Sequence, residues 1–190
     1  MSSPAAVRGQ AVRGRLLSAA VELISERGWS GVSTRILAQR AGVSASVVHY
    51  HFSSVDVLLR EAVVGVIARV VSELDAVLAR VETPVEAVEM IFATAEEYTG
   101  ADAPTLAGVE AILAAGRDVE LRDRIGAVFE EFRHRFGSWL AARGVAAGDD
   151  TAAVVVAAVD GLVLQRCAGV QLSSGAAVAV VRRLVTVEEE

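Results

Sequence analysis

Cysteine and proline are scarce in this 190-residue chain, and no long uninterrupted apolar run occurs. Cys167 is the only cysteine, so an intrachain disulfide is excluded and a reducing compartment is expected. Residues 1–14 lack the continuous apolar segment of a signal peptide. The most apolar run, 152–164, is interrupted by Asp160 and is shorter than the roughly 20 residues of a membrane-spanning helix. We therefore expect a soluble, cytoplasmic protein with no membrane partner.

The motifs of common enzyme and metal-binding classes are missing as well. No nucleophile elbow, phosphate-binding loop or dinucleotide-binding glycine pattern occurs. His49 and His51 lie two residues apart, so on a helix they point in nearly opposite directions and cannot hold one ion together. The ligand spacings of zinc sites are also absent. We predict that the protein is not an enzyme and holds neither a metal nor a cofactor.

The sequence is rich in aliphatic residues at helical spacing. Hydrophobic residues make up 53% of the chain and the mean hydropathy is +0.46, so a sizeable core is expected rather than disorder. Alanine, leucine and arginine favour helices. Helical patterns cover about 15–27, 34–41, 44–52, 54–81, 83–99, 105–115, 119–143, 151–170 and 175–187. The predicted fold class is all-α.

Charge is distributed unevenly along the chain, whose net charge is −6. Residues 1–60 contain seven arginines and three acidic residues and carry +4, whereas residues 61–190 carry −10. A basic head on an acidic body is typical of a protein whose N-terminal part binds a polyanion.

The stretch TRILAQRAGVSASVVHYHF, residues 34–52, has the pattern of a helix-turn-helix. Ala38 is small enough for two helices to cross closely, Gly42 makes the turn, and Val48 anchors the second helix. The aromatic HYHF segment and a long helix that begins with serine caps follow directly. The pattern predicts that the second helix, which ends near Phe52, is a recognition helix.

Residues 12–60 as a whole resemble the TetR family of helix-turn-helix transcriptional regulators. The resemblance implies a three-helix DNA-binding head, residues 1–54, and a larger helical body, residues 55–190, for ligand binding and dimerisation. It also implies a homodimer with its two recognition helices in successive major grooves of a near-palindromic operator. Self-association through about 151–187 is indicated independently, because 151–170 is apolar almost all the way round.

Eight residues of the head are candidates for contact with DNA. Hydroxyls, amides and a guanidinium at the start of a helix suit phosphate, and small polar or aromatic side chains on a recognition helix suit base edges or phosphates. These residues are Ser33, Thr34, Arg35, Ser44, Ala45, Ser46, His49 and Tyr50.

The head departs from the family in having few cations around the recognition helix. The family often has a lysine at the start of this helix and another after its aromatic pair, where Ala45 and Ser53–Val55 stand here. Fewer cations imply fewer neutralised phosphates, hence a shallower salt dependence or more use of the N-terminal arginines. Those arginines, Arg8, Arg13 and Arg15, are either DNA contacts or part of a disordered solubilising tail.

The body contains four candidate ligand-binding residues, which are Phe92, Glu96, Phe129 and Trp139. The aromatic residues are either cavity lining or ordinary core. Glu96 and Asp160 lie at helical spacing from apolar neighbours, so each is either a polar anchor in a cavity or a carboxylate that pairs with an arginine or lies at the rim of the core. The candidate arginines are Arg117, Arg135 and Arg166.

Together these features predict a repressor that occupies an operator and is released when a small apolar or amphipathic molecule enters the body. The same sequence signals suit an effector-independent regulator or an activator. They also suit a helix-turn-helix adaptor that binds a protein partner instead of DNA.

Overall fold

The computed structural model describes residues 4–170 and 173–186, and every regular element in this part of the chain is a helix. The head comprises α1 (Pro4–Arg27), the short 3-10 turn η1 (Trp29–Gly31), α2 (Thr34–Ala41) and α3 (Ala45–His51). The body comprises α4 (Val55–Leu78), α5 (Pro84–Glu96), α6 (Ala103–Ala115), α7 (Val119–Ala141), α8 (Gly148–Cys167), α9 (Ser174–Val181) and η2 (Arg182–Leu184). The predicted all-α fold is confirmed.

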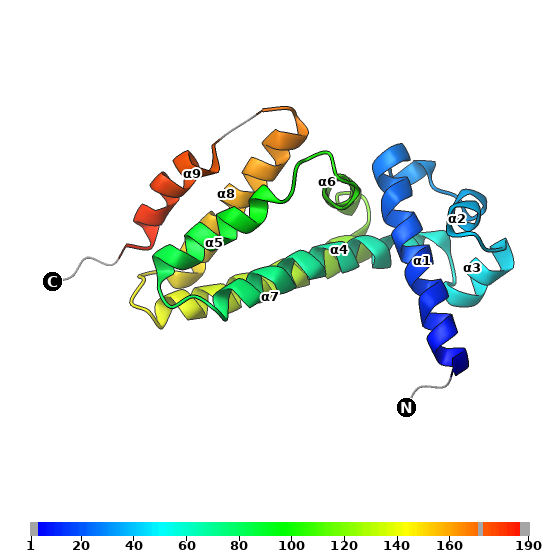
Figure 1. Cartoon of the computed structure of the whole chain (residues 1–190), viewed down its shortest axis with the longest axis horizontal. Helices are drawn as coiled ribbons and strands as arrows, with labels where there is room; N and C mark the ends of the chain where they lie inside the picture. The colour runs from blue at the N-terminus through cyan, green and yellow to red at the C-terminus, as the bar shows by residue number, and fades with distance from the viewer. Residues whose placement is uncertain (1–3, 171–172, 187–190) are drawn as a thin grey trace.

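The molecule is elongated, with the head at one end (Figure 1). Helices α4 and α7 run alongside each other through the body, and α5, α8 and α9 lie at the end far from the head. Helix α6 packs against α1, so it joins the body to the head. The head is therefore attached to the body both through the chain, by α4, and through space, by α6.

Side-chain caps fix the starts of four body helices. Each cap accepts a hydrogen bond from a backbone N–H three residues further on, which satisfies a donor that the helix leaves unpaired. The caps are Ser54 of α4, Thr83 of α5, Asp102 of α6 and Asp118 of α7. Ser33 and Ser44 stand at the corresponding positions of α2 and α3 but make no such bond, contrary to the capping role that a serine there predicts.

The head core draws on both parts of the chain. Leu16, Leu23 and Ile24 of α1 are completely buried, and the side chains packed around them come from α2, α3, α4, α6 and α7. These side chains include Leu37, Val48, Leu58, Leu59, Ala107, Ala111 and Leu121. Because α6 and α7 contribute to this core, a shift of either helix changes its packing against the helices of the head.

The body has a second core, built around aromatic residues of α5 and α7. Phe92, Phe132 and Phe136 are at most 1% exposed, and the rings of Phe132 and Phe136 stack with centroids 5.9 Å apart. Helices α7 and α8 approach each other closely at Gly137 and Gly148. A β-carbon added at Gly148 would lie 2.3 Å from the carbonyl oxygen of Gly137, so the crossing requires glycine.

The N-terminal arginines do not form a disordered tail. Helix α1 begins at Pro4 rather than near residue 15, so Arg8, Arg13 and Arg15 all lie within one helix of 24 residues. Of the two alternatives for these arginines, the tail was wrong; residues 4–14 include Gly9 and Gly14, which weaken the helical signal of the sequence. Tertiary contacts of Arg13, described below, hold this part of α1.

The segment predicted to self-associate, about 151–187, forms α8, α9 and η2 in its described part. Residues 171–172 and 187 of that segment lie outside the described residues. The last helix is shorter than its pattern predicts, because the chain tightens into η2 after Val181. Within the described residues, no helix is both long enough and apolar enough to pass through a membrane.

Candidate nucleic-acid interface

The connection between α2 and α3 has the geometry of a helix-turn-helix. Gly42 ends α2 with φ 67° and ψ 38°, a left-handed conformation that other residues adopt at a cost. The N–H of Val43 donates to the carbonyl of Ala38 at 3.0 Å and closes the turn. Ala38 and Val48 are buried in the head core, as the sequence pattern predicts. The buried side fixes α3, which leaves its other side facing solvent.

The solvent side of α3 is polar and carries one prominent aromatic residue. Ser44, Ser46 and His49 are exposed, and Tyr50 is 85% exposed. The hydroxyls of Ser44 and Ser46 lie 2.8 Å apart and share a hydrogen bond. The ring of Tyr50 meets the ring of His51 edge-on, with centroids 5.1 Å apart. A tyrosine this exposed contributes nothing to the core and is available to a partner.

The start of α2 carries a second group of polar residues. Ser33 and Arg35 are exposed and Thr34 is half-buried. The hydroxyl of Ser33, like that of Ser44, caps no backbone N–H, so it is available to a phosphate oxygen. Among the described residues Arg35 takes part in no ion pair. This cation is therefore available to an anion from outside the chain.

Three of the seven arginines of residues 1–60 are occupied within the chain. Arg40 donates to Glu22 at 2.9 Å and to Glu26 at 2.6 Å. These hydrogen bonds raise the pKa of Arg40 above its usual range, and the bond to Arg40 lowers the pKa of Glu26. Arg13 pairs with Glu61, and Arg60 pairs with Asp118 and Glu120. Within the described residues, the arginines of this region without an ion pair are Arg8, Arg15, Arg27 and Arg35.

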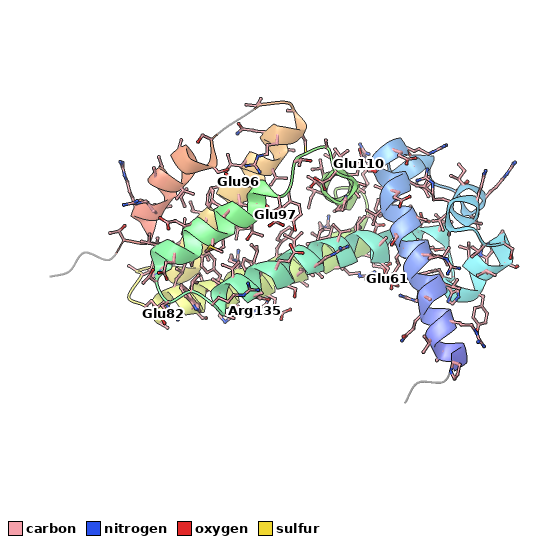
Figure 2. The ribbon with its side chains drawn as sticks, viewed as in Figure 1. Glu61, Glu82, Glu96, Glu97, Glu110 and Arg135 are labelled. Atoms are coloured by element: carbon pink, nitrogen blue, oxygen red, sulfur yellow. The ribbon has the colours of Figure 1, made fainter. Side chains whose placement is uncertain are left out.

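The four residues predicted to bind a ligand do not meet in one place. Phe92 lies in the body core, whereas Glu96, at the end of α5, is exposed. Figure 2 labels Glu96 at the end of α5 that leads toward α6. Phe129 packs against the head core. Trp139 is half-buried beside Arg143, whose guanidinium carbon lies 3.6 Å from the centroid of the indole ring.

The arginines predicted as partners of Glu96 and Asp160 have other roles. Arg166 donates to the carbonyls of Ala95 and Tyr98 and to the hydroxyl of Ser174, so it caps the end of α5. Arg135, which Figure 2 labels, pairs with Asp75 and Glu131, and Arg117 is exposed. The predicted pairing with these arginines was therefore wrong, because Arg135 and Arg166 bind other acids and carbonyls. Glu96 and Asp160 are exposed, which fits the alternative of carboxylates at the rim of the core.

Asp160 stands without an ionic partner in the described part of the chain, on an otherwise apolar side of α8. The residue is exposed, yet the apolar side chains of α8 around its carboxylate desolvate it in part, and this raises the pKa of Asp160 to about 6. Around it, Val154 and Leu164 are more than half exposed. A row of exposed apolar residues with one carboxylate thus runs along α8.

Sequence reasoning missed one polar cluster that bears on the recognition helix. Arg13 of α1 pairs with Glu61 of α4, and its guanidinium carbon lies 4.7 Å from the ring centroid of Phe52. Arg13 and Glu61 are 48 residues apart in the chain. Neither residue lies in a local motif, so no signal in the sequence links them.

Comparison with known proteins agrees with this geometry. Residues 16–62 match the model described as bacterial regulatory proteins of the tetR family, and residues 82–187 match the C-terminal domain described as tetracyclin repressor-like. The HTH-type transcriptional regulator BetI of Brucella anthropi is 32% identical over 81 residues. That match covers 43% of this chain and 42% of BetI, so it spans less than half of either protein.

Solved structures resemble the chain over nearly its whole length. SCO7518 of Streptomyces coelicolor A3(2) is 27% identical with a TM-score of 0.74, and the match covers 93% of this chain and 99% of that one. The multidrug binding protein EbrR, solved with imidazole, is 30% identical with a TM-score of 0.68, and the match covers 94% and 92%. Because the C-terminal model alone matches more than half of the residues and the N-terminal model covers the helix-turn-helix, the chain belongs to the TetR family of transcriptional regulators.

Proposed function

We propose that this DNA-binding regulator is a repressor that a small apolar or amphipathic molecule releases from its operator. The observation that carries the DNA-binding half is the exposed side of α3, where hydroxyls, an imidazole and a phenol stand on a helix fixed by its buried side. The effector half is supported by α4 and α7, because each of these helices contributes buried residues to both cores. The name of EbrR, a multidrug binding protein, also supports a small-molecule effector.

In this proposal residues 1–54 form the DNA-binding unit. Ser33, Thr34 and Arg35 bind phosphates, since they gather hydroxyls, backbone N–H groups and a cation at the start of α2. Ser44, Ala45, Ser46, His49 and Tyr50 face the major groove. Serine and histidine read base edges there, and the tyrosine hydroxyl binds phosphate or a base edge.

Residues 55–190 form the regulatory unit, in which two copies of the chain meet through about 151–187. The exposed apolar residues of this segment support the proposal, because a monomer rarely leaves so many in contact with water. They include Val154, Leu164, Val180 and Leu184. Such a dimer holds two α3 helices for half-sites about 34 Å apart, one turn of DNA, on a near-palindromic operator.

The effector is proposed to act from within the body by favouring a dimer whose α3 helices no longer fit that spacing. It shifts the equilibrium only by its difference in affinity for the two shapes. Phe92 stays our first candidate contact, because it lies with Phe132 and Phe136 in the apolar core that an apolar molecule would enter. Trp139 packs against the same core, with its ring centroid 6.5 Å from that of Phe136. Glu96 and Phe129 remain weaker candidates, because Glu96 is exposed and Phe129 packs against the head core.

The proposal is tested first by selecting bound duplexes from a random DNA pool and then titrating the selected duplex by fluorescence anisotropy. A preference of about 10³ or more over a scrambled duplex is expected for a sequence-specific regulator. His49→Ala and Tyr50→Ala should each weaken this preference. Equal, weak binding to both duplexes, unchanged in these variants, would instead favour the adaptor that binds a protein partner.

The titrated complex then serves to screen small apolar and amphipathic molecules for release. Release by one compound class supports an effector-controlled repressor. Specific binding that no compound weakens favours the effector-independent regulator, and transcription that rises with bound protein favours the activator.

A further inference from the structure

The recognition helix is held at its C-terminal end by a residue of α1. Phe52 follows α3, is 3% exposed, and donates its backbone N–H to the carbonyl of Val48 at 2.9 Å. The guanidinium carbon of Arg13 lies 4.7 Å from the centroid of the Phe52 ring. A cation over an aromatic face is an attractive contact with a defined geometry. Arg13 therefore contacts the residue at which α3 ends.

The same guanidinium is fastened to α4. Both terminal nitrogens of Arg13 donate to the carboxylate of Glu61, one to each oxygen, and the bond to Oε2 is 2.6 Å long. A two-point fork fixes the direction of both side chains as well as their separation. Figure 2 labels Glu61 where α4 passes α1. Arg13 thus joins α1, the end of α3 and the second turn of α4 at one point.

The residue next to Glu61 reaches in the other direction. Arg60 donates through Nε to Asp118 at 2.7 Å, and its Nη1 lies 3.0 Å from Glu120. Asp118 caps α7 by accepting the N–H of Leu121 at 3.0 Å. Two adjacent side chains of α4 therefore bind opposite parts of the molecule, one at the start of α7 and one at the end of α3.

From this arrangement we propose that Arg13 is a positioning residue, which fixes the recognition helix relative to α4 through Phe52 and Glu61. Arg60 extends the same connection to the start of α7. The inference rests on the proposed DNA contacts of α3, because the position of that helix matters only if it binds DNA. It assigns Arg13 to an internal contact, whereas the charge of the N-terminal arginines alone suggests a phosphate contact.

The direction in which one substitution changes the DNA affinity distinguishes a positioning role from simple electrostatics. Glu61→Gln removes a negative charge from the head, and by charge alone this strengthens binding to the DNA polyanion. If Glu61 positions α3, the substitution instead weakens binding to the selected duplex, by about tenfold. The matched control is Asp56→Asn, which removes the same charge from an exposed side chain of α4 that forms no ion pair with Arg13. Asp56→Asn should bind as tightly as the wild type or slightly more tightly.

A second variant keeps all charges in place. Arg13→Lys retains the cation but loses the two-point fork and the planar contact with the ring. We expect about tenfold weaker binding, with an unchanged slope of log K against log salt concentration, since no phosphate contact is lost. If Arg13 binds phosphate instead, Arg13→Lys keeps most of the affinity and Arg13→Ala flattens the slope. That pair of results would overturn the proposal.

The link to α7 is tested with Arg60→Gln in a double-mutant cycle. If the two substitutions act on one connected unit, the affinity of the double variant should differ by threefold or more from the product of the effects of Arg60→Gln and Glu61→Gln. Effects that multiply place Arg60 outside it and overturn that part of the proposal. Circular dichroism of each variant verifies that the helices are intact.

Hydrogen exchange supplies a readout that needs no DNA. The amides of residues 45–52 should exchange faster in Glu61→Gln and Arg13→Lys than in the wild type, and at the wild-type rate in Asp56→Asn. A wild-type protein that binds no duplex refutes the proposed function. Wild-type exchange and wild-type affinity in both cluster variants refute the positioning role of Arg13 and leave the proposed function standing.

Discussion

Arg35→Ala should reduce the salt dependence of operator binding, because Arg35 is the one cation among the eight predicted contacts. It stands in the first turn of α2, is exposed, and has no ion pair within the described residues. Arg13, Arg40 and Arg60 are held by carboxylates of the same chain, so they release few counterions on binding. Arg35 should therefore account for a large share of the phosphate neutralisation.

The expected change in salt dependence can be calculated from counterion release. Each neutralised phosphate contributes about 0.9 to the slope of log K against log salt concentration, and a dimer carries two copies of Arg35. The slope of Arg35→Ala should thus be smaller by about 1.8. When the salt concentration rises fourfold, from 50 to 200 mM, both proteins lose affinity. The loss of the variant should be smaller than that of the wild type by a factor of about 12.

The assay is fluorescence anisotropy with the selected duplex at four or more salt concentrations. The control is Arg40→Ala, which removes the same residue type from the same helix. Because Glu22 and Glu26 already neutralise Arg40, its removal should leave the slope unchanged. The reasoning would be refuted if the slope of Arg35→Ala lay within about 0.5 of the wild type, or if both variants lowered the slope equally.

Three predictions concern stability. Gly148→Ala should lower the free energy of unfolding by about 2 kcal/mol, because the new β-carbon meets the carbonyl of Gly137 at 2.3 Å. The control Gly65→Ala has open space around the new atom and should raise the free energy of unfolding by about 0.5–1 kcal/mol. Equal thermal melts of the two variants would contradict this prediction. Ala147→Gly should raise the melting temperature slightly, by about 0.5 kcal/mol in stability, since Ala147 has φ 49° and ψ 50°; a lower melting temperature would count against left-handed strain there. Asp160→Asn should stabilise the protein by about 1 kcal/mol at pH 7.5 and by much less at pH 4. The pKa of Asp160 is raised to about 6, so the protonated carboxyl contributes its full stability below about pH 4, and this contribution is lost as pH rises through 6. Because the residue is exposed, solvent limits the size of the stability change. The same gain at both pH values would rule out the carboxylate as its cause.

Much of the head was predictable because its signals are local. Gly42 supplies the left-handed turn, and the period of 3.6 residues puts Val48 on the buried side and His49 on the exposed side of α3. The sequence also showed that α8 has apolar residues on nearly every side, so that a small helical body cannot bury all of them. These features depend on neighbours within a turn or two of helix.

The roles of the charged residues were decided by the tertiary structure. The sequence shows seven arginines in residues 1–60 but not that carboxylates 14 to 60 residues away occupy three of them. Likewise, periodicity groups Phe92 with Glu96, whereas the packing of α5 buries the first and leaves the second in water. The helices, the turn and the exposed side of α3 are therefore readable from the sequence, because backbone geometry and hydrophobic periodicity act over a few residues. Which arginines stay without an ion pair, and that Arg13 contacts three helices, depends on packing, because ion pairs form between side chains that meet only after the helices have packed.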